Sequence, residues 1–143
     1  MGAATAYSAY RRSEVETLNP RNLLVKLFEA MEHSIEQGAM AMQNQHFEMS
    51  AKNCRRIRDI LFELQSTLNF AAGGEVAKRL DGIYSFMIIE VTEAGLRQDA
   101  KRLRSLQRIV RPLIEGWKGI PEEHAHTTSL IGDAKQNIIS LRG

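Results

Sequence analysis

Four blocks of apolar residues, spaced by three and four positions, follow one another along this sequence with short breaks between them. That spacing places the apolar side chains on one face of a helix. The breaks fall at about 43–46, 69–74 and 95–98, where the apolar stripe is lost. Four helices of similar length with short connections pack as an antiparallel bundle. The sequence therefore predicts an all-α fold, an up-down-up-down four-helix bundle.

Local signals set the bounds of these helices. The expected ranges are about 20–42, 47–68, 75–94 and 99–117. Pro20 suits a first helical turn because its missing N–H would be unpaired there, and Asn19 can cap that turn. The Gly73-Gly74 pair marks the break before the third helix. Asp99 is a favourable N-cap for the fourth.

Each helix has an inner stripe that we expect to face the core. Pro112 interrupts the fourth stripe and should kink or loosen that helix, because it has no N–H to donate to the carbonyl of Arg108. The stripes are Leu24, Leu27, Met31 and Ile35; Phe47, Ala51, Cys54, Ile57, Leu61, Leu64 and Leu68; Val76, Leu80, Ile83, Met87 and Val91; and Leu103, Leu106, Val110, Leu113 and Trp117.

The rest of the chain flanks this bundle. Residues 1–19 carry no sustained stripe and are expected to form an N-terminal cap segment, while 119–143 form an extension with a short amphipathic helix at about 129–141. The single cysteine, Cys54, cannot form an internal disulfide, which suits a reducing compartment. No signal peptide and no membrane-length apolar run is present. We therefore expect a cytoplasmic protein without membrane insertion.

Catalytic patterns are scarce. A bundle that holds two metal ions would need paired Glu-x-x-His motifs, and only Glu123 and His126 match that spacing. The inner stripes contain almost no carboxylates, and the sequence has neither a phosphate-binding loop nor a nucleophile elbow. We expect no enzyme activity, no cofactor or metal and no small-molecule substrate.

Basic residues form two rows, and two interpretations stay open. A nucleic acid or an acidic protein surface could bind such rows. Alternatively, they are solvated helix faces with acidic neighbours, an interpretation favoured by the lack of aromatic residues for base stacking. The rows are Arg97, Lys101, Arg104, Arg108 and Arg111 on the fourth helix, and Lys52, Arg55, Arg56 and Arg58 on the second.

Apolar residues outside the stripes are the more informative feature. Together they suggest more apolar surface than one interior can hide, and methionine is common on surfaces that accept helical segments. Grooves would result, and the N-terminal Tyr7 and Tyr10 fit a cover that a partner could displace. The surplus residues are Leu23, Phe28, Ile60, Phe62, Tyr84, Ile88 and Ile109, with Met31, Met40, Met42, Met49 and Met87.

Several blocks resemble the flagellar secretion chaperone family. They are Tyr7-Ser8-Ala9-Tyr10, Val15-Glu16-Thr17, Asn19-Pro20, Ser66-Thr67-Leu68-Asn69-Phe70, Gly73-Gly74-Glu75-Val76-Ala77-Lys78-Arg79-Leu80, Ile83-Tyr84-Ser85-Phe86-Met87 and Trp117. The order and spacing of the Ser-Thr-Leu-Asn and Gly-Gly-Glu blocks carry most of this similarity. It extends from about Ala6 to Lys118 and leaves the stretch from Pro121 onward unaccounted for.

This resemblance implies a chaperone of the bacterial cytosol. Such a protein holds the disordered C-terminal segment of flagellin in apolar grooves, prevents premature polymerisation, and assists delivery to the flagellar type III export apparatus. Tyr7 and Tyr10 would form the displaceable cap. The candidate groove residues are Leu24, Leu27, Ile57, Leu61, Leu64, Leu68, Tyr84 and Met87. Whether the free protein forms a homodimer through its apolar surface stays open.

Overall fold

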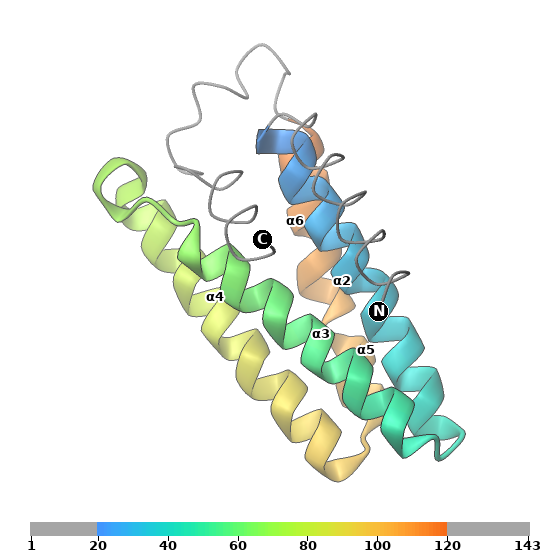
Figure 1. The fold of residues 1–143 in the computed structure, drawn as a ribbon. Coiled ribbons are helices and arrows are strands. Elements are labelled where there is room, and N and C mark those ends of the chain that lie inside the picture. The colour runs from blue at the N-terminus through green and yellow to red at the C-terminus, as the bar shows by residue number, and fades with distance from the viewer. Residues whose placement is uncertain (1–19, 120–143) are drawn as a thin grey trace, which may run out of the picture.

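A computed structural model describes residues 20–119 as a bundle of antiparallel helices without a strand in that range (Figure 1). The helices are α2 (Pro20–Gln43), α3 (Phe47–Ser66), α4 (Phe70–Arg97), α5 (Ala100–Ser105) and α6 (Gln107–Lys118). The expected all-α bundle is thus confirmed, with α5 and α6 together as its fourth arm. The expected Asn19 cap, the Tyr7 and Tyr10 cover, and the helix at 129–141 lie outside the described residues.

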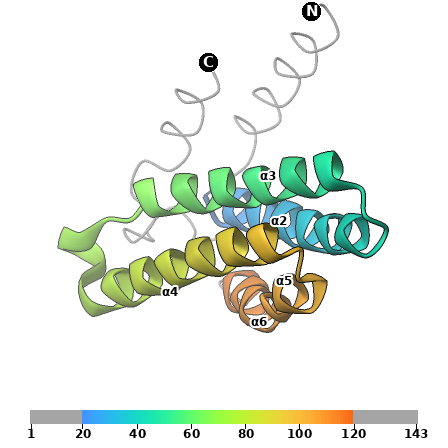
Figure 2. The same ribbon diagram turned by 90° about the horizontal axis from the view of Figure 1, so that it is seen from below.

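The four arms are arranged in a cycle (Figures 1 and 2). Helix α2 packs against α3 on one side and against α5 and α6 on the other, and α4 closes the cycle between α3 and α5. Helix α3 therefore lies diagonally opposite α5 and α6 across the core. This arrangement leaves one broad outer surface where α3 meets α4, and another where α2 meets the fourth arm.

A continuous apolar core fills the centre of the bundle. The rings of Phe28 and Tyr84 meet across it, with centroids 6.4 Å apart and planes tilted by 39°. Each large side chain buried in this way contributes about 1.5–3 kcal/mol of transfer free energy. Close approach of α2 depends on Gly38, because a Cβ there would lie 3.0 Å from Cδ2 of Leu103 and 3.3 Å from Cβ of Asn53.

Helix α4 starts earlier than the sequence suggests. The Asn69 side chain accepts a hydrogen bond from the backbone N–H of Ala72, which caps a first turn at Phe70 rather than at Glu75. The expected break then appears as a kink at Gly74, where φ is 51° and ψ is −127°. Only glycine adopts that backbone conformation without strain.

The fourth arm is interrupted, but not at the expected residue. Asp99 caps α5 by accepting a hydrogen bond from the backbone N–H of Arg102, as predicted. The interruption falls at Leu106, where the N–H of Leu106 bonds to Leu103 and that of Ile109 bonds to Leu106. These three-residue bonds tighten the turn into 3₁₀ geometry. Pro112 lies inside α6, and the expected kink or loosening there stays a prediction.

The prediction that every member of the inner stripes faces the core is wrong for three residues. Phe47, Ala51 and Val76 are exposed, whereas the stripe of α2 is buried throughout. Phe47 is the first residue of α3, and Val76 follows the Gly74 kink directly. At such positions the neighbouring helix does not extend far enough to cover a side chain, even though the spacing continues the stripe.

Candidate partner-binding surface

The groove residues expected from the sequence lie together in the core. Seven of them are buried: Leu24, Leu27, Ile57, Leu61, Leu64, Tyr84 and Met87. Leu68 is half-buried and packs against the same cluster. Burial raises the pKa of the Tyr84 hydroxyl, as expected for a phenol removed from water. The structure thus brings these eight residues into one cluster, and their role in binding a partner stays a prediction.

The first turns of α2 carry apolar residues around most of the helix. Leu23, Leu24 and Val25 are consecutive and all three are buried, although successive side chains point about 100° apart. Leu27 and Phe28 are buried one turn later. A helix that is apolar on most of its sides must be enclosed on most of its sides. This end of α2 therefore needs more cover than a single packing seam.

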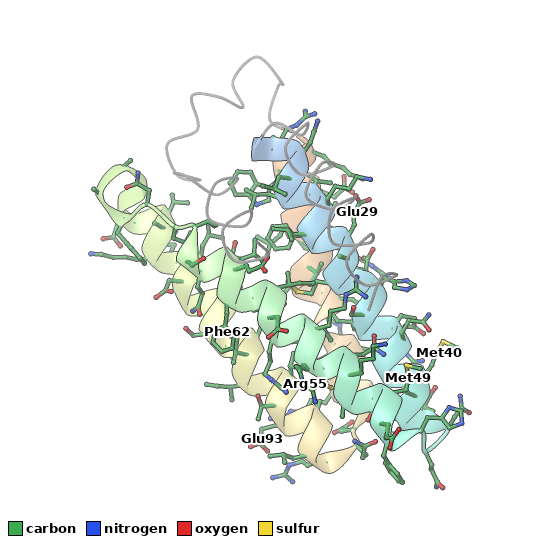
Figure 3. All side chains as sticks on the ribbon, in the orientation of Figure 1. Glu29, Met40, Met49, Arg55, Phe62 and Glu93 are labelled. Atoms are coloured by element: carbon green, nitrogen blue, oxygen red, sulfur yellow. The ribbon has the colours of Figure 1, made fainter. Side chains whose placement is uncertain are left out.

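Most of the surplus apolar residues turn out to be core, which corrects the sequence-based list. Leu23, Phe28, Ile60, Tyr84, Met31, Met42 and Met87 are buried, and Ile88 and Ile109 are half-buried. Phe62, Met40 and Met49 are exposed, as a surplus would be. Figure 3 shows Met40 and Met49 near the turn between α2 and α3, and Phe62 between α3 and α4.

Other exposed apolar residues lie on α4 and were missed. Phe86, Ile89 and Leu96 are all exposed on the outer side of that helix. Their spacing of three and seven is itself a helical stripe, offset from the one that faces the core. A helical wheel of α4 could have revealed it, because two apolar stripes on one helix imply two contact surfaces.

Hydrogen bonds at both ends hold α3 and α4 in register. Gln65 donates to the hydroxyl of Ser85 at 2.8 Å and to the Asp81 carboxylate at 3.2 Å. At the opposite end Gln98 donates to the hydroxyl of Ser50 at 3.2 Å and to the Gly95 carbonyl at 2.8 Å. Side-chain bonds at two distant points fix how far one helix can slide along the other.

This register forms a mixed apolar and basic surface, here called the α3–α4 face: Arg55, Arg58, Phe62, Ile89 and Leu96. Phe62 lies one turn from Gln65, and Ile89 one turn from Ser85, so the two apolar side chains adjoin across the seam. The exposed fractions are 54% for Phe62, 60% for Ile89 and 76% for Leu96. Figure 3 places Phe62 and Arg55 along the line where α3 and α4 meet.

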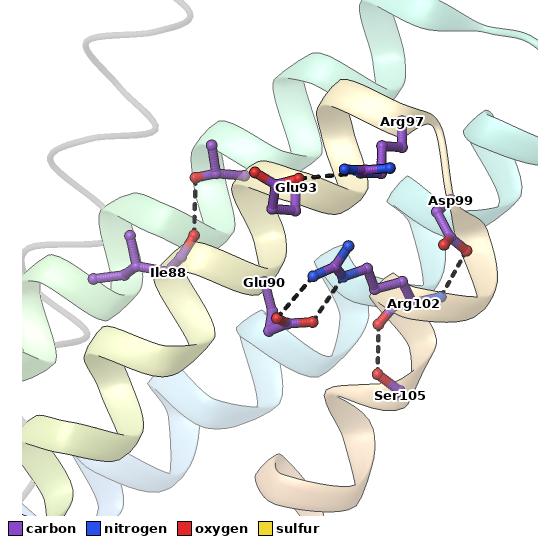
Figure 4. Close-up of polar contacts among 8 residues, drawn as sticks. Ile88, Glu90, Glu93, Arg97, Asp99, Arg102 and Ser105 are labelled. Atoms are coloured by element: carbon purple, nitrogen blue, oxygen red, sulfur yellow. Dashed lines mark hydrogen bonds and ion pairs between the residues drawn. The ribbon is translucent and has the colours of Figure 1, made fainter.

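The fourth arm, in contrast, carries several cations that pair with acidic residues of α2 and α4. Four ion pairs connect it to those helices: Glu36–Arg104, Glu32–Arg111, Glu29–Lys118 and Glu90–Arg102. The Arg102 pair is bidentate, at 2.8 and 3.0 Å (Figure 4). Hydrogen bonds from Arg104 and Arg102 lower the pKa of Glu36 and Glu90, respectively. Of the predicted row, Arg104 and Arg111 are thus paired with α2 and Arg97 with Glu93 of its own helix, while Lys101 and Arg108 make no ion pair within residues 20–119.

Residues 20–119 contain no group of three His, Cys, Asp or Glu side chains that could hold a metal ion. Cys54 is buried under Gly95, and burial raises the pKa of its thiol, which disfavours the reactive thiolate. Over the same range, no helix combines the length and the apolar character needed to cross a bilayer.

Comparison with known proteins identifies the family. The model of the flagellar protein FliS matches residues 3–124, which is most of the chain and includes every helix described above. The chain belongs to the FliS family. The Ser-Thr-Leu-Asn block of the resemblance lies at the turn between α3 and α4, and the Gly-Gly-Glu block lies at the Gly74 kink of α4.

Flagellar secretion chaperones from several bacteria match most of this chain, and the match spans most of their own length. A flagellar secretion chaperone from Vibrio cholerae is 28% identical over 82% of this chain and 86% of its own length. One from Campylobacter jejuni is 28% identical over 80% and 90%, and one from Bacillus subtilis is 25% identical over 82% and 87%. The chain is thus a flagellar secretion chaperone by family.

Proposed function

We propose that this chain is an export chaperone for flagellin. It binds the disordered C-terminal segment of flagellin in apolar grooves, prevents premature polymerisation in the bacterial cytoplasm, and assists delivery to the flagellar type III export apparatus. FliS family membership over residues 3–124 is the observation that carries this proposal. The chain acts by binding, not by catalysis.

The apolar start of α2 supports a groove at that end of the bundle. Leu24 and Leu27 lie there, among consecutive buried apolar residues. Because these side chains are buried, a flagellin segment reaches them only by replacing whatever covers them. We propose that Tyr7 and Tyr10 belong to that displaceable cover. Ordering a disordered segment costs several kcal/mol, so the gain must come from a large apolar contact.

The direct test is a titration with flagellin itself. The probe is a labelled peptide of about forty residues, long enough for a coupled folding and binding interface, from the C-terminal end of the flagellin of the same organism. We expect a complex with micromolar affinity or better, seen as a rise in fluorescence anisotropy. A peptide of the same composition in scrambled order is the control. Failure of the native peptide to bind at micromolar concentrations would contradict the proposal.

Hydrogen exchange on the same complex locates the groove. Amide protection should change around Leu24 and Leu27 when the native peptide is added, and stay constant with the scrambled peptide. Changes confined to α5 and α6 would place the segment elsewhere, while leaving the chaperone function intact.

A further inference from the structure

Cations in this bundle fall into two groups. Those of the fourth arm are mostly paired, through the four ion pairs to α2 and α4. None of the four basic residues of α3, Lys52, Arg55, Arg56 and Arg58, makes an ion pair in the part of the chain that the structure describes. On the fourth arm, Lys101 and Arg108 are likewise without an ion pair in that range, but α3 is the helix on which all the cations are so, and it lies diagonally opposite the fourth arm.

Two of these unpaired cations, Arg55 and Arg58, belong to the α3–α4 face. Along α3, Arg58 lies about one turn and Arg55 about two turns from the exposed ring of Phe62. The carboxylate of Glu93, on the α4 side, accepts a hydrogen bond from Arg97 at 3.1 Å and is committed there (Figures 3 and 4). Apolar side chains and two guanidinium groups thus lie on one surface, and neither arginine is ion-paired with a described carboxylate, the neighbouring Asp59 included.

We propose that the α3–α4 face docks an amphipathic helix of another protein, one that carries carboxylates beside its apolar row. Phe62, Ile89 and Leu96 supply the apolar contact, and Arg55 and Arg58 supply the charge. Guanidinium groups pair with carboxylates through bidentate hydrogen bonds, which fix orientation as well as affinity. This inference goes beyond flagellin binding and stands whether or not flagellin binds at α2.

A second copy of this chain fits the same face poorly. A two-fold contact pairs the face with itself, so each copy would have to supply carboxylates for Arg55 and Arg58 of the other. Burying those cations together without a carboxylate would cost more than the apolar contact returns. The carboxylates of α2, which could compensate, are already paired with the fourth arm. The charge pattern therefore selects an acidic partner of a different sequence.

The experiment uses two model peptides and the full chain. Each peptide is a helix of about 18 residues, or roughly 27 Å, with leucines in one row. Glutamates flank the leucines in the first peptide, and lysines flank them in the second. We expect the acidic peptide to bind about tenfold more tightly than the basic one, a ratio typical of a few exposed charge pairs. The ratio should shrink as salt is added.

Charge reversal on the protein then tests the location. The double variant Arg55→Glu and Arg58→Glu should invert the preference, so that the basic peptide becomes the tighter ligand. The matched control is Lys101→Glu with Arg108→Glu, which changes the net charge equally on the fourth arm, where neither residue is ion-paired with a described carboxylate. That control should keep the original preference.

A third variant tests the apolar half of the face. Phe62→Ala with Ile89→Ala should weaken acidic-peptide binding about tenfold, from the loss of two exposed apolar contacts. If charge reversal impairs folding, as judged by circular dichroism, Arg55→Gln with Arg58→Gln takes its place and should abolish the preference. Equal affinity for both peptides, or equal loss in the Lys101 and Arg108 control, would overturn the proposal.

Discussion

The seam between α2 and the fourth arm differs from the α3–α4 face in how its charges and apolar groups are used. At the seam, Glu36, Glu32 and Glu29 each meet a cation of α5 or α6. At the α3–α4 face, Arg55 and Arg58 form no ion pair with any carboxylate of residues 20–119, and apolar side chains are exposed beside them. The seam uses its charges within the bundle, and the α3–α4 face is the one for which we propose a partner.

This difference teaches how to weigh a row of basic residues. Both rows look similar in the sequence, and the more regular one lies on the fourth arm. Arg104 and Arg111 of that row pair with carboxylates on α2, so part of it serves the bundle. The less regular row on α3 has exposed apolar neighbours and no ion pair within residues 20–119, which makes it the better candidate for recognition.

The largest expected effect separates core from surface on one helix. Leu61 and Phe62 are adjacent on α3, but Leu61 is fully buried while Phe62 is exposed. Leu61→Ala should lower the free energy of unfolding by about 2–5 kcal/mol through lost apolar contacts and a cavity. Phe62→Ala should change it by about 0.5 kcal/mol or less. Urea unfolding followed by circular dichroism measures both, and similar losses would mean that the α3–α4 face is packed rather than open.

An intermediate effect concerns the kink that starts α4. Gly74→Ala should destabilise the protein by about 1–3 kcal/mol, because an alanine is strained at its backbone conformation. Gly73→Ala is the matched control, since Gly73 has no positive φ and a helical alanine is favourable there. Thermal unfolding compares the two. A neutral Gly74→Ala would show that α4, and with it the α3–α4 face, tolerates a different kink.

The smallest expected effect on stability concerns the ion pair between Glu36 and Arg104, at the seam between α2 and the fourth arm. The hydrogen bond from Arg104 lowers the pKa of Glu36 below its ordinary value of 4.5. Its contribution is therefore fully present above about pH 4.5 and is lost as the pH falls through the lowered pKa. Glu36→Gln should lower the free energy of unfolding slightly at pH 7, because the ion pair is partly solvated. The loss should be smaller than that of Leu61→Ala or of Gly74→Ala.

The pH dependence of stability below pH 4.5 provides the control for that prediction. Stability of Glu36→Gln should decline less steeply below pH 4.5 than that of the unchanged protein, since one titrating carboxylate is gone. Melting temperatures measured from pH 7 to pH 3 give both slopes. Parallel curves would mean that the ion pair at Glu36 does not contribute to folding.

Helices and caps could be predicted because they depend on local chemistry. The Asp99 cap, the Pro20 start and the Gly74 break each follow from a residue's own backbone preferences. The interruption at Leu106 could not, because neither Leu106 nor its neighbours have a breaking tendency.

The candidate site was harder to predict, for a physical reason. Spacing identifies apolar faces but not which of two faces a neighbour covers, so Phe28 and Ile60 were assigned to surplus surface and lie in the core. Ile89 and Leu96 were overlooked because they fall off the main stripe of α4. Pairing of charges between helices is equally invisible until the helices are placed together.

The buried position of Trp117 makes the bundle its own optical reporter. It is the one tryptophan of the chain, and it packs into the core at the end of α6, next to the start of α2. Its emission should shift to the red when the fourth arm detaches from α2. A ligand on the α3–α4 face lies on the opposite side and should leave that emission unchanged. Events at the two surfaces can therefore be told apart in solution without attaching a dye.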